Sequence, residues 1–256
     1  MNRTKIDWCD YVWNPVWGCR NDCPYCYARK IARRFASNIV RKEYEFLKIP
    51  GVKEEFSTLY PGVASVLCYS REHFENALRK YLPVFLISNF KKQFPRKPSR
   101  IFVNSMSDIH FWKKEWMELV LKKIKENSQH TFIFLTKYPE VYKRYSFPEN
   151  CWLGYSNEGD ALYPEWSTVF NKNIKFVSLE PLLRYDSREL CLVIHTLNWI
   201  VVGFQTNPYK PAPREDVESV IRYARRYKIP IFLKDNVYRV YPDLPVLKEF
   251  PVKTNI

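Results

Sequence analysis

The chain has 256 residues, of which 46% are apolar, so it is long and apolar enough to bury a full hydrophobic core rather than remain disordered. Its formal net charge of +14 favours a polyanionic partner, nucleic acid first and an anionic membrane surface second, with a lysine-rich surface that serves thermal stability as an equal alternative. No apolar run approaches the length of a transmembrane helix, and the first residues lack the apolar stretch of a signal peptide.

Short β-rich runs bounded by turn residues predict the strands. The runs are Val12–Val16, Ala64–Tyr69, Arg100–Ser105, Thr131–Thr136, Trp152–Ser156, Lys175–Leu179, Trp199–Gly203 and Pro230–Leu233. Their near-continuous apolar composition is typical of strands that are covered on both faces, as in parallel sheets.

Apolar residues at three- and four-residue spacing predict amphipathic helices between these strands. The helices are Glu115–Lys125, Glu215–Lys228 and Tyr27–Val40, the last with an apolar face formed by Tyr27, Ile31, Phe35 and Ile39. Repeated strand-then-helix order implies parallel pairing through right-handed crossovers. The sequence therefore predicts the α/β class and one domain over residues 1–256, a (β/α) TIM-type barrel, complete or partial, with six to eight parallel strands.

Two stretches fall outside the strand-helix alternation. Residues 41–62, after the first helix, and residues 82–99, before the third strand, are predicted to be insertions. Residues 241–256 carry Pro242, Pro245 and Pro251 and are predicted to form an extended C-terminal tail.

Three cysteines follow the first predicted strand with the spacing C-x3-C-x2-C: Cys19, Cys23 and Cys26. Three thiolates on one short loop suit a metal. A cubic 4Fe–4S cluster has four iron corners, so three cysteines hold it and leave one iron for a substrate or cofactor. The alternative is a zinc site, which requires four closed ligands and would need Cys9 or a histidine to complete it.

The other cysteines stand alone in apolar or strand-like settings and are predicted to be buried thiols. They are Cys9, Cys68, Cys151 and Cys191. Seven cysteines in a chain without a signal peptide indicate a reducing compartment, and hence a cytoplasmic protein that uses thiols for metal binding or catalysis rather than for disulfides.

The cysteine spacing, with the aromatic Tyr25 before the last cysteine, resembles the radical S-adenosylmethionine (SAM) superfamily. More closely, the chain resembles the uncharacterised phage-type Gp37/Gp68 family of radical-SAM-like proteins, in matches that run in order from residue 4 to about residue 234. The shared stretches are Thr4–Trp8, Trp13–Pro15, Gly18–Cys19, Cys26–Ala28, Phe102–Asp108, Leu135–Lys137, Trp152–Gly154 and Ser178–Leu183.

This resemblance implies an iron–sulfur enzyme. Cys19, Cys23 and Cys26 would hold three irons of a 4Fe–4S cluster, and the amino and carboxylate groups of SAM would chelate the fourth. An electron from a donor such as a ferredoxin or flavodoxin would then cleave SAM to methionine and a 5′-deoxyadenosyl radical, which abstracts hydrogen from a substrate. The resemblance leaves the substrate open.

Polar side chains follow several predicted strands at the end where loops of (β/α) barrels hold the chemistry. Asp108 and Glu180 could accept from the SAM ammonium or ribose, and Lys137 could face the SAM carboxylate or a substrate phosphate. The candidate cofactor-binding residues are Tyr25, Ser105, Ser107, Asp108, Lys137, Asn157 and Glu180. For each of them, ordinary capping of a strand-to-loop turn is the alternative.

One loop departs from the family. After the seventh strand the family tends to carry Gly-Gly-Glu-Ser-Gly, whereas this chain has Gly203-Phe204-Gln205-Thr206-Asn207. Two glycines that would let backbone approach a ligand are missing, and a carboxylate is replaced by the neutral Gln205. This departure suggests a different substrate or a lost contact.

Basic residues gather in stretches free of acidic residues and interleaved with aromatic ones, a composition that suits phosphate contacts and base stacking. The candidate nucleic-acid-binding residues are Arg29, Lys30, Arg33, Arg34, Lys91, Lys92, Arg96 and Lys97. A solvated surface is the alternative. Three hypotheses follow: a radical SAM enzyme that modifies or repairs a nucleobase or nucleic acid, one that acts on a small metabolite or peptide, and a non-catalytic nucleic-acid-binding protein with a metal-stapled loop.

Overall fold

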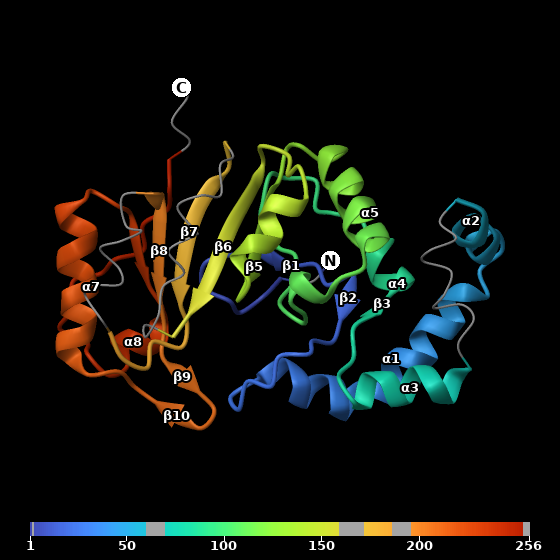
Figure 1. Cartoon of the computed structure of the whole chain (residues 1–256), viewed down its shortest axis with the longest axis horizontal. Coiled ribbons are helices and arrows are strands. Elements are labelled where there is room, and N and C mark those ends of the chain that lie inside the picture. The colour runs from blue at the N-terminus through green and yellow to red at the C-terminus, as the bar shows by residue number, and fades with distance from the viewer. Residues whose placement is uncertain (2, 60–69, 159–171, 186–195, 253–256) are drawn as a thin grey trace. The chain divides into compact units, whose positions relative to one another are not determined.

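The computed structural model describes residues 1, 3–59, 70–158, 172–185 and 196–252. The chain divides into two compact units (Figure 1). The first unit comprises Met1–Arg3 and Tyr11–His130, and the second comprises Thr4–Asp10 and Thr131–Ile256. The predicted strand Ala64–Tyr69 lies outside the described residues.

The first unit contains two short pairs of strands. Strand β1 (Tyr11–Val12) pairs in parallel with β4 (Arg100–Phe102), and β2 (Val16–Trp17) pairs antiparallel with β3 (Val84–Phe85). The single strand predicted over Val12–Val16 is therefore two strands. Pro15 has no N–H to donate to a ladder, and the side chain of Asn14 bonds instead to the loop after β4, so pairing stops between them.

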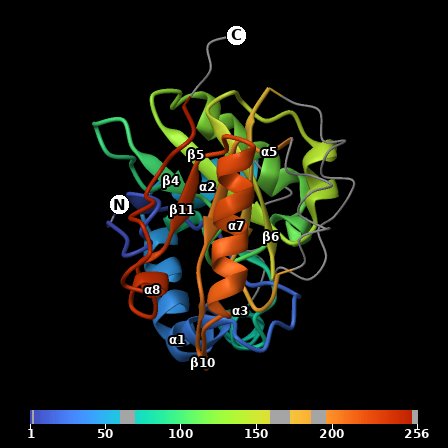
Figure 2. The same ribbon diagram turned by 90° about the vertical axis from the view of Figure 1, so that its left-hand side faces the viewer.

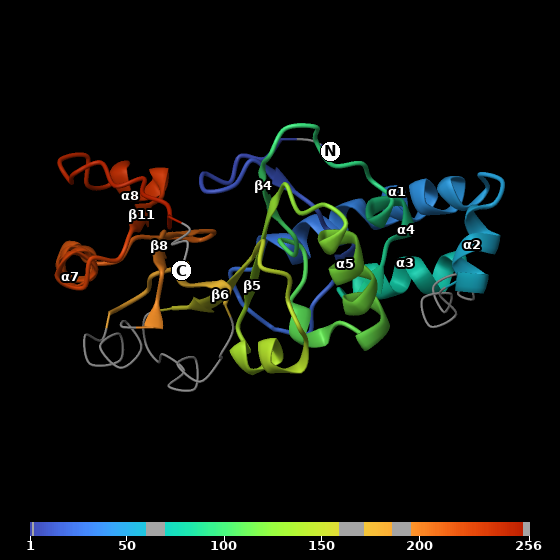
Figure 3. The same ribbon diagram turned by 90° about the horizontal axis from the view of Figure 1, so that it is seen from above.

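The helices of the first unit occupy much of the rest of it. They are α1 (Tyr27–Leu47), α2 (Val52–Leu59), α3 (Arg71–Arg79), α4 (Ile87–Phe90) and α5 (Lys114–Lys125), with a 3₁₀ turn at Ile109–Phe111. In Figure 3, α1, α2 and α3 form one group. Residues 41–62 thus contain the end of α1 and all of α2, and residues 82–99 contain β3 and α4. The predicted helix Glu115–Lys125 is confirmed.

The apolar face predicted for α1 is wrong by one position. The helix buries Ala28, Ala32, Ala36 and Val40, whereas Tyr27 is 48% exposed and Phe35 is 41% exposed. Alanine side chains let α1 and α3 pack closely side by side, so fit between the helices, and not the size of the apolar side chains, decides which face is buried.

The second unit contains five parallel strands among its described residues. They are β5 (Thr131–Thr136), β6 (Cys151–Asn157), β7 (Ile174–Leu179), β8 (Trp199–Val202) and β11 (Ile231–Leu233), neighbours in that order. The strands predicted here are confirmed to within one residue at each end. Strands β9 (Gln205–Thr206) and β10 (Tyr209–Lys210) form an antiparallel hairpin.

Two helices and a 3₁₀ segment (Pro139–Arg144) complete the described part of this unit. Helix α7 (Arg214–Arg226) runs alongside the strands (Figure 2) and buries Val217, Val220 and Ala224. It matches the helix predicted at Glu215–Lys228. The short α8 (Asp235–Tyr238) follows β11. Downstream, Leu247 accepts the N–H of Leu233 at 2.8 Å, so this part of the predicted tail lies along β11.

An aromatic cluster forms the core of the second unit around Trp199, which is fully buried. Its ring centroid lies 5.2 Å from Phe176, 5.6 Å from Trp152 and 6.3 Å from Trp8. Trp8 comes from the Thr4–Asp10 segment, so this cluster attaches that segment to the strands of the unit. Large aromatic rings contribute much of the apolar area that stabilises a core.

Parallel strands and helices occur in both units, which confirms the predicted α/β class. Among the described residues, no helix has the length and apolar character that crossing a membrane requires.

Candidate functional site

The cysteine loop begins directly after β2 and is held against the first unit by its backbone. Gly18 has φ +99°, and a Cβ atom there would come within 2.1 Å of the carbonyl oxygen of Leu82. The N–H of Gly18 donates to Met106 at 3.0 Å, and the N–H of Cys19 donates to the carbonyl of Tyr81 at 2.9 Å. Only glycine allows this close approach, so Gly18 sets the direction in which Cys19 leaves the strand.

Two of the three thiols accept backbone hydrogen bonds. Cys26 is the N-cap of α1, and its Sγ accepts the N–H of Arg29 at 3.4 Å. The Sγ of Cys19 accepts the N–H of Asn21 at 3.3 Å. The guanidinium of Arg29 bonds to the carboxylate of Asp22 and to the carbonyl of Asn21, which holds the middle of the loop against the start of the helix. These bonds place sulfur atoms at an end of α1 where the helix dipole favours negative charge.

The thiol of Cys19 is held in its neutral form. Its pKa is raised to about 12, chiefly by burial; the bond from the Asn21 amide opposes this shift, and the nearby Asp108, Cys23 and Cys26 add to it. Burial also raises the pKa of Tyr81, whose hydroxyl donates to the carbonyl of Met106 at 2.9 Å. Negative charge on the loop is therefore unfavourable unless a cation accompanies it.

The donor chemistry of this loop suits a soft metal. Among the described residues, no three histidine, cysteine, aspartate or glutamate side chains are arranged as a metal-binding group. The three loop cysteines are nevertheless outside any disulfide, and electrostatic interactions couple Cys19 to both Cys23 and Cys26. A bound cation deprotonates thiols, which would reverse the shift at Cys19. The residues thus fit a 4Fe–4S cluster as donors.

The loop after β4 contributes its polar residues next to the cysteines. Asp108 is buried, and its carboxylate accepts Nδ2 of Asn21 at 3.3 Å and the N–H of His110 at 2.9 Å. Ser107 forms an isolated parallel β-bridge with Gly18, and its Oγ accepts a hydrogen bond from Nε1 of Trp112 at 3.0 Å. The carbonyl of Ser105 accepts the hydroxyl of Tyr27 at 2.9 Å. Of the predicted cofactor-binding residues, Asp108, Ser107 and Ser105 therefore lie beside the cysteine loop, to which Tyr25 itself belongs.

A second polar cluster lies at the carboxyl ends of strands in the second unit, around Glu180. Its Oε1 pairs with Nζ of Lys234 at 2.6 Å, and its Oε2 accepts Oγ of Ser178 at 2.8 Å and Nε1 of Trp8 at 3.2 Å. A Cβ at Gly203 would lie 2.8 Å from Cδ of Lys234 and 3.0 Å from Oε1 of Glu180. Gly203 begins the loop whose sequence differs from the family pattern. Because it lacks a side chain, it leaves space for the ion pair of Glu180 and Lys234.

The remaining predicted residues of the second unit also have partners. Nζ of Lys137 pairs with Oε1 of Glu158 at 2.7 Å, joining the loops that follow β5 and β6. Asn157 is buried, and its Nδ2 donates to the hydroxyl of Tyr155 at 3.1 Å. Lys137, Asn157 and Glu180 thus belong to the second unit, whereas the cysteines, Ser105, Ser107 and Asp108 belong to the first.

A family model described as a protein of unknown function (DUF5131) matches residues 3–238. The chain belongs to this family. No curated protein and no solved structure matches it. The matched range nearly coincides with residues 4–234, over which the sequence resembles radical-SAM-like phage proteins. That resemblance remains a hypothesis for this member of the DUF5131 family.

The basic residues predicted to contact nucleic acid differ in their exposure and in their existing bonds in this DUF5131 protein. Arg29 is occupied within the cysteine loop, and Lys91 pairs with Glu55 at 2.6 Å. Lys92 is half-buried. The exposed members are Lys30, Arg33, Arg34, Arg96 and Lys97. Of these, Arg33 donates from Nε to the carbonyl of Arg79 at 3.2 Å.

Five residues around these sites were absent from the predicted site of this DUF5131 protein. Asn21 bonds to both Cys19 and Asp108, and Tyr81 lies beside the thiols. The other three are Trp8, Glu158 and Lys234. Trp8 belongs to a stretch shared with the resembling family, which could have marked it. Glu158 and Lys234 lie outside the stretches shared with that family, and only folding brings them to Lys137 and Glu180.

Proposed function

We propose that this protein is a radical SAM enzyme built on a partial TIM-type barrel. Cys19, Cys23 and Cys26 would hold a 4Fe–4S cluster and leave one iron to SAM. When bound, the cluster would supply reducing power for the cleavage of SAM and thereby for hydrogen abstraction from the substrate. A ferredoxin or flavodoxin would be the electron donor.

The observation that carries this proposal is the setting of the three thiols. None of the three is in a disulfide, they lie on one short loop, and two of their sulfurs accept backbone N–H groups. Hydrogen bonds to sulfur tune thiolate-bound iron–sulfur clusters. Gly18 and Arg29 hold this loop in position from its two ends.

Residues near the loop support roles in binding SAM. The buried carboxylate of Asp108 interacts electrostatically with Cys19, which supports a role for Asp108 in neutralising the ammonium group of SAM. The hydroxyl groups of Ser105 and Ser107 are neutral donors for the SAM carboxylate or ribose. In the second unit, Lys137, Asn157 and Glu180 remain candidates for SAM or for the substrate.

For the substrate we propose a nucleobase in nucleic acid or a nucleotide-derived compound. Helix α1 begins at the last cysteine and exposes basic and aromatic residues at helical spacing on one side. Tyr27, Lys30, Arg34 and Phe35 are all exposed, and the guanidinium of Arg34 lies 5.4 Å from the centre of the Phe35 ring. Cations that bind phosphates beside rings that stack on bases are the usual components of a single-strand interface.

Anaerobic reconstitution with iron, sulfide and a reductant, followed by quantification of 5′-deoxyadenosine and methionine from SAM, tests the chemistry. We expect about four irons per chain, an iron–sulfur absorption band, and SAM cleavage. The variants Cys19→Ala, Cys23→Ala and Cys26→Ala should each lose cleavage by more than 100-fold, because each removes one of only three thiolate ligands. Cleavage that persists in all three variants contradicts the proposal.

Two other cysteines provide controls and separate the alternatives. Cys151→Ser changes a buried thiol outside the loop, so the reconstituted variant should keep its iron and its activity. Cys9→Ala should also be active; if it instead loses one tightly bound zinc per chain, the zinc-stapled binding protein is supported. If SAM cleavage reaches its full rate with a small metabolite or peptide and without nucleic acid, an enzyme that acts on such a small substrate is favoured.

A further inference from the structure

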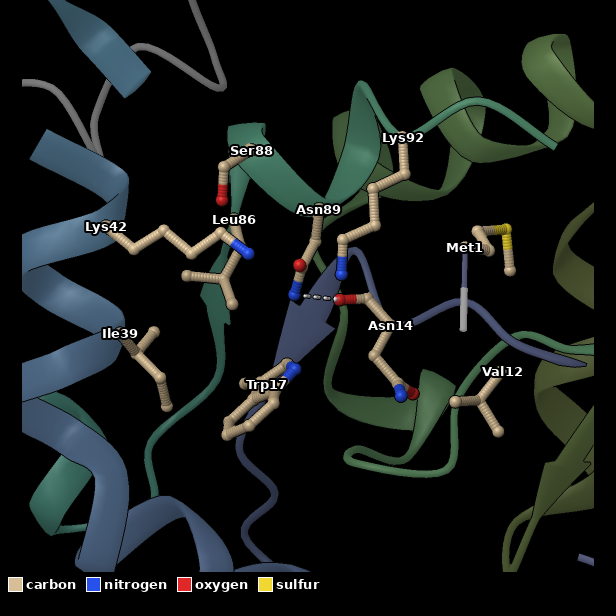
Figure 4. A pocket seen from close by; sticks show the side chains of 10 residues that line it. All are labelled: Met1, Val12, Asn14, Trp17, Ile39, Lys42, Leu86, Ser88, Asn89 and Lys92. Atoms are coloured by element: carbon tan, nitrogen blue, oxygen red, sulfur yellow. Dashed lines mark hydrogen bonds between the residues drawn. The ribbon is translucent and has the colours of Figure 1, made fainter. Parts of the chain in front are cut away.

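A pocket in the first unit lies between β2, the second half of α1 and the α4 region. Its volume is about 420 Å³, and it is lined by Met1, Val12, Asn14, Trp17, Ile39, Lys42, Leu86, Ser88, Asn89 and Lys92 (Figure 4). Lys42 lies 16 residues after Cys26 on α1, which corresponds to about 24 Å along the helix axis. None of the three cysteines lines the pocket, but its wall at Trp17 packs on the same small hydrophobic cluster as Cys19 and Cys26, so the pocket extends from the neighbourhood of the cysteine loop toward Lys42.

Hydrogen-bond donors without partners converge on this pocket. Figure 4 shows the side chains of Lys42 and Lys92 reaching toward it from different elements. Neither ammonium takes part in an ion pair within the described residues. Nε1 of Trp17 is buried and has no hydrogen-bond partner among them. Lys42 is exposed and Lys92 is half-buried, so the buried donor without a partner is Nε1 of Trp17. Because an unpaired buried donor is unfavourable, a ligand that brings an acceptor to this N–H and negative charge to the two lysines would be stabilised here.

The nearby acidic residue does not supply those acceptors. Glu43 is 1% exposed, and its carboxylate accepts the N–H of Ile87 at 2.5 Å and the N–H of Ser88 at 3.1 Å. It thus caps α4 and is not among the pocket-lining residues. Burial lowers the pKa of Lys92; the charge of Lys42 lowers it further, and Glu43 raises it. An anion between the two lysines would relieve their repulsion.

The amide groups of the pocket are rigid. Nδ2 of Asn89 donates to the carbonyl of Asn14 at 3.0 Å. The side chain of Asn14 exchanges hydrogen bonds with Ser105 at 2.9 and 3.1 Å and accepts the N–H of Met106 at 3.1 Å. The walls beside them are apolar and include Trp17, Ile39 and Leu86. A free inorganic anion would leave these walls without contacts, so the pocket suits an anion that carries an organic group.

We propose that this pocket binds a phosphate ester with a flat organic group, as in a nucleotide, with the phosphate between Lys42 and Lys92 and the organic group beside Trp17. The inference rests on the residues of the pocket and requires neither cluster nor SAM. The nucleotide is either free or the end of a polymer, since both present the same chemistry.

Isothermal titration of the metal-free protein tests the site, with three probes at 50 mM salt: adenosine monophosphate, inorganic phosphate and a 5′-phosphorylated single-stranded oligonucleotide. Lys42→Gln and Lys92→Gln should each weaken the binding of adenosine monophosphate about 10-fold, because each removes one charged contact to phosphate. Trp17→Phe, which keeps a ring and removes the N–H, should weaken it about 5-fold. Lys114→Gln changes an exposed lysine of α5 outside the pocket and should bind like the wild type.

The outcomes separate the sources and the alternatives. Binding of adenosine monophosphate that depends on both lysines supports a free nucleotide, and lysine-dependent binding of the oligonucleotide alone supports a polymer end. Inorganic phosphate bound as tightly as the nucleotide overturns the assignment of an organic group. Absence of binding by all three probes, or equal binding by Lys42→Gln and the wild type, overturns the site. Binding retained in Cys19→Ala separates this result from any failure of the cluster proposal.

Discussion

Gly18 shows how one residue positions the cysteine loop. Its φ of +99° lies in the region that side chains rarely adopt, and the backbone of Leu82 occupies the space where a Cβ would stand. Gly51, in the turn before α2, has a similar φ of +81° but no heavy atom within 4 Å of an added Cβ. Alanine substitution at Gly51 therefore measures the free-energy cost of a positive φ alone, and substitution at Gly18 measures that cost plus the cost of the clash with Leu82.

Gly18→Ala should lower the free energy of unfolding by about 3 kcal/mol or more, because left-handed strain adds to a backbone clash that cannot relax through a side chain. Gly51→Ala should lower it by about 1 kcal/mol, from the dihedral alone. Urea denaturation followed by circular dichroism measures both. Equal losses for the two variants would show that the Leu82 contact does not constrain the loop.

At the scale of elements, α5 carries a half-buried cation, Lys123, in an aromatic setting. Nζ of Lys123 lies 5.0 Å from the ring centres of Phe90 and Phe94 and 5.4 Å from that of Trp13. It donates to the carbonyls of Phe90 and Lys92. Burial lowers the pKa of Lys123 from 10.5 to about 8, and the charge of Lys91 contributes in the same direction. Lys123 thus links α5 to the segment after α4. Its burial there makes the protonated form of the side chain less favourable than in water.

Stability should depend on pH through this lysine. Between pH 8 and 10.5 the unfolded chain retains a proton that the folded chain has lost, so the free energy of unfolding rises with pH over this range. Below pH 8 both states are protonated, and this contribution stays at its lowest, constant value. With allowance for solvent screening, this group contributes at most about 1 kcal/mol per pH unit. Lys123→Met should flatten that rise, whereas Lys122→Met, at an exposed neighbour, should not. Urea midpoints from pH 7 to 10 measure the slopes, and parallel slopes for wild type and Lys123→Met would contradict the assignment.

At the scale of the whole molecule, the net charge of +14 is the dominant electrostatic property. Several cations are already occupied: Arg29 in the cysteine loop, Lys91 with Glu55, and Lys234 with Glu180. Exposed cations of α1 lie next to exposed rings, which is the arrangement that gives salt-dependent binding of single strands. Charge alone does not distinguish such a surface from one that serves solubility.

Binding of a single-stranded oligonucleotide should weaken steeply with salt. Contact with about four phosphates gives a slope of about −3 in log affinity against log salt concentration, or roughly 50-fold between 50 and 200 mM. The double variant Lys30→Gln/Arg34→Gln should reduce the steepness by about 1.4, because two phosphate contacts are lost. Lys114→Gln, a change in an exposed lysine of α5, serves as the control. Fluorescence anisotropy measures the slopes, and affinity that is indifferent to salt would favour a small metabolite or peptide as the substrate.

The local pattern of the sequence predicts the helices and strands of this protein better than it predicts which of their faces pack together. Thr131–Thr136 is predicted and observed over the same residues, because a run of apolar β-formers between turn residues has few alternatives. The face of α1 is predicted wrongly, because periodicity reveals that a helix is amphipathic but not which of two neighbouring apolar stripes a partner will cover. Val12–Val16 divides into two strands because Asn14 bonds to a distant loop.

The sequence by itself determined the α/β class, the strands of the second unit and the three thiols that follow β2, since these depend on local composition and spacing. Tertiary structure alone decided the surroundings of those residues. Asp108 and Tyr81 lie beside the thiols, Lys234 neutralises Glu180, and Lys42 and Lys92 reach one pocket, all through contacts between segments far apart in the chain. Charge and hydrogen bonding act through space, so the chemistry of a site depends on which side chains folding brings within a few ångströms of each other.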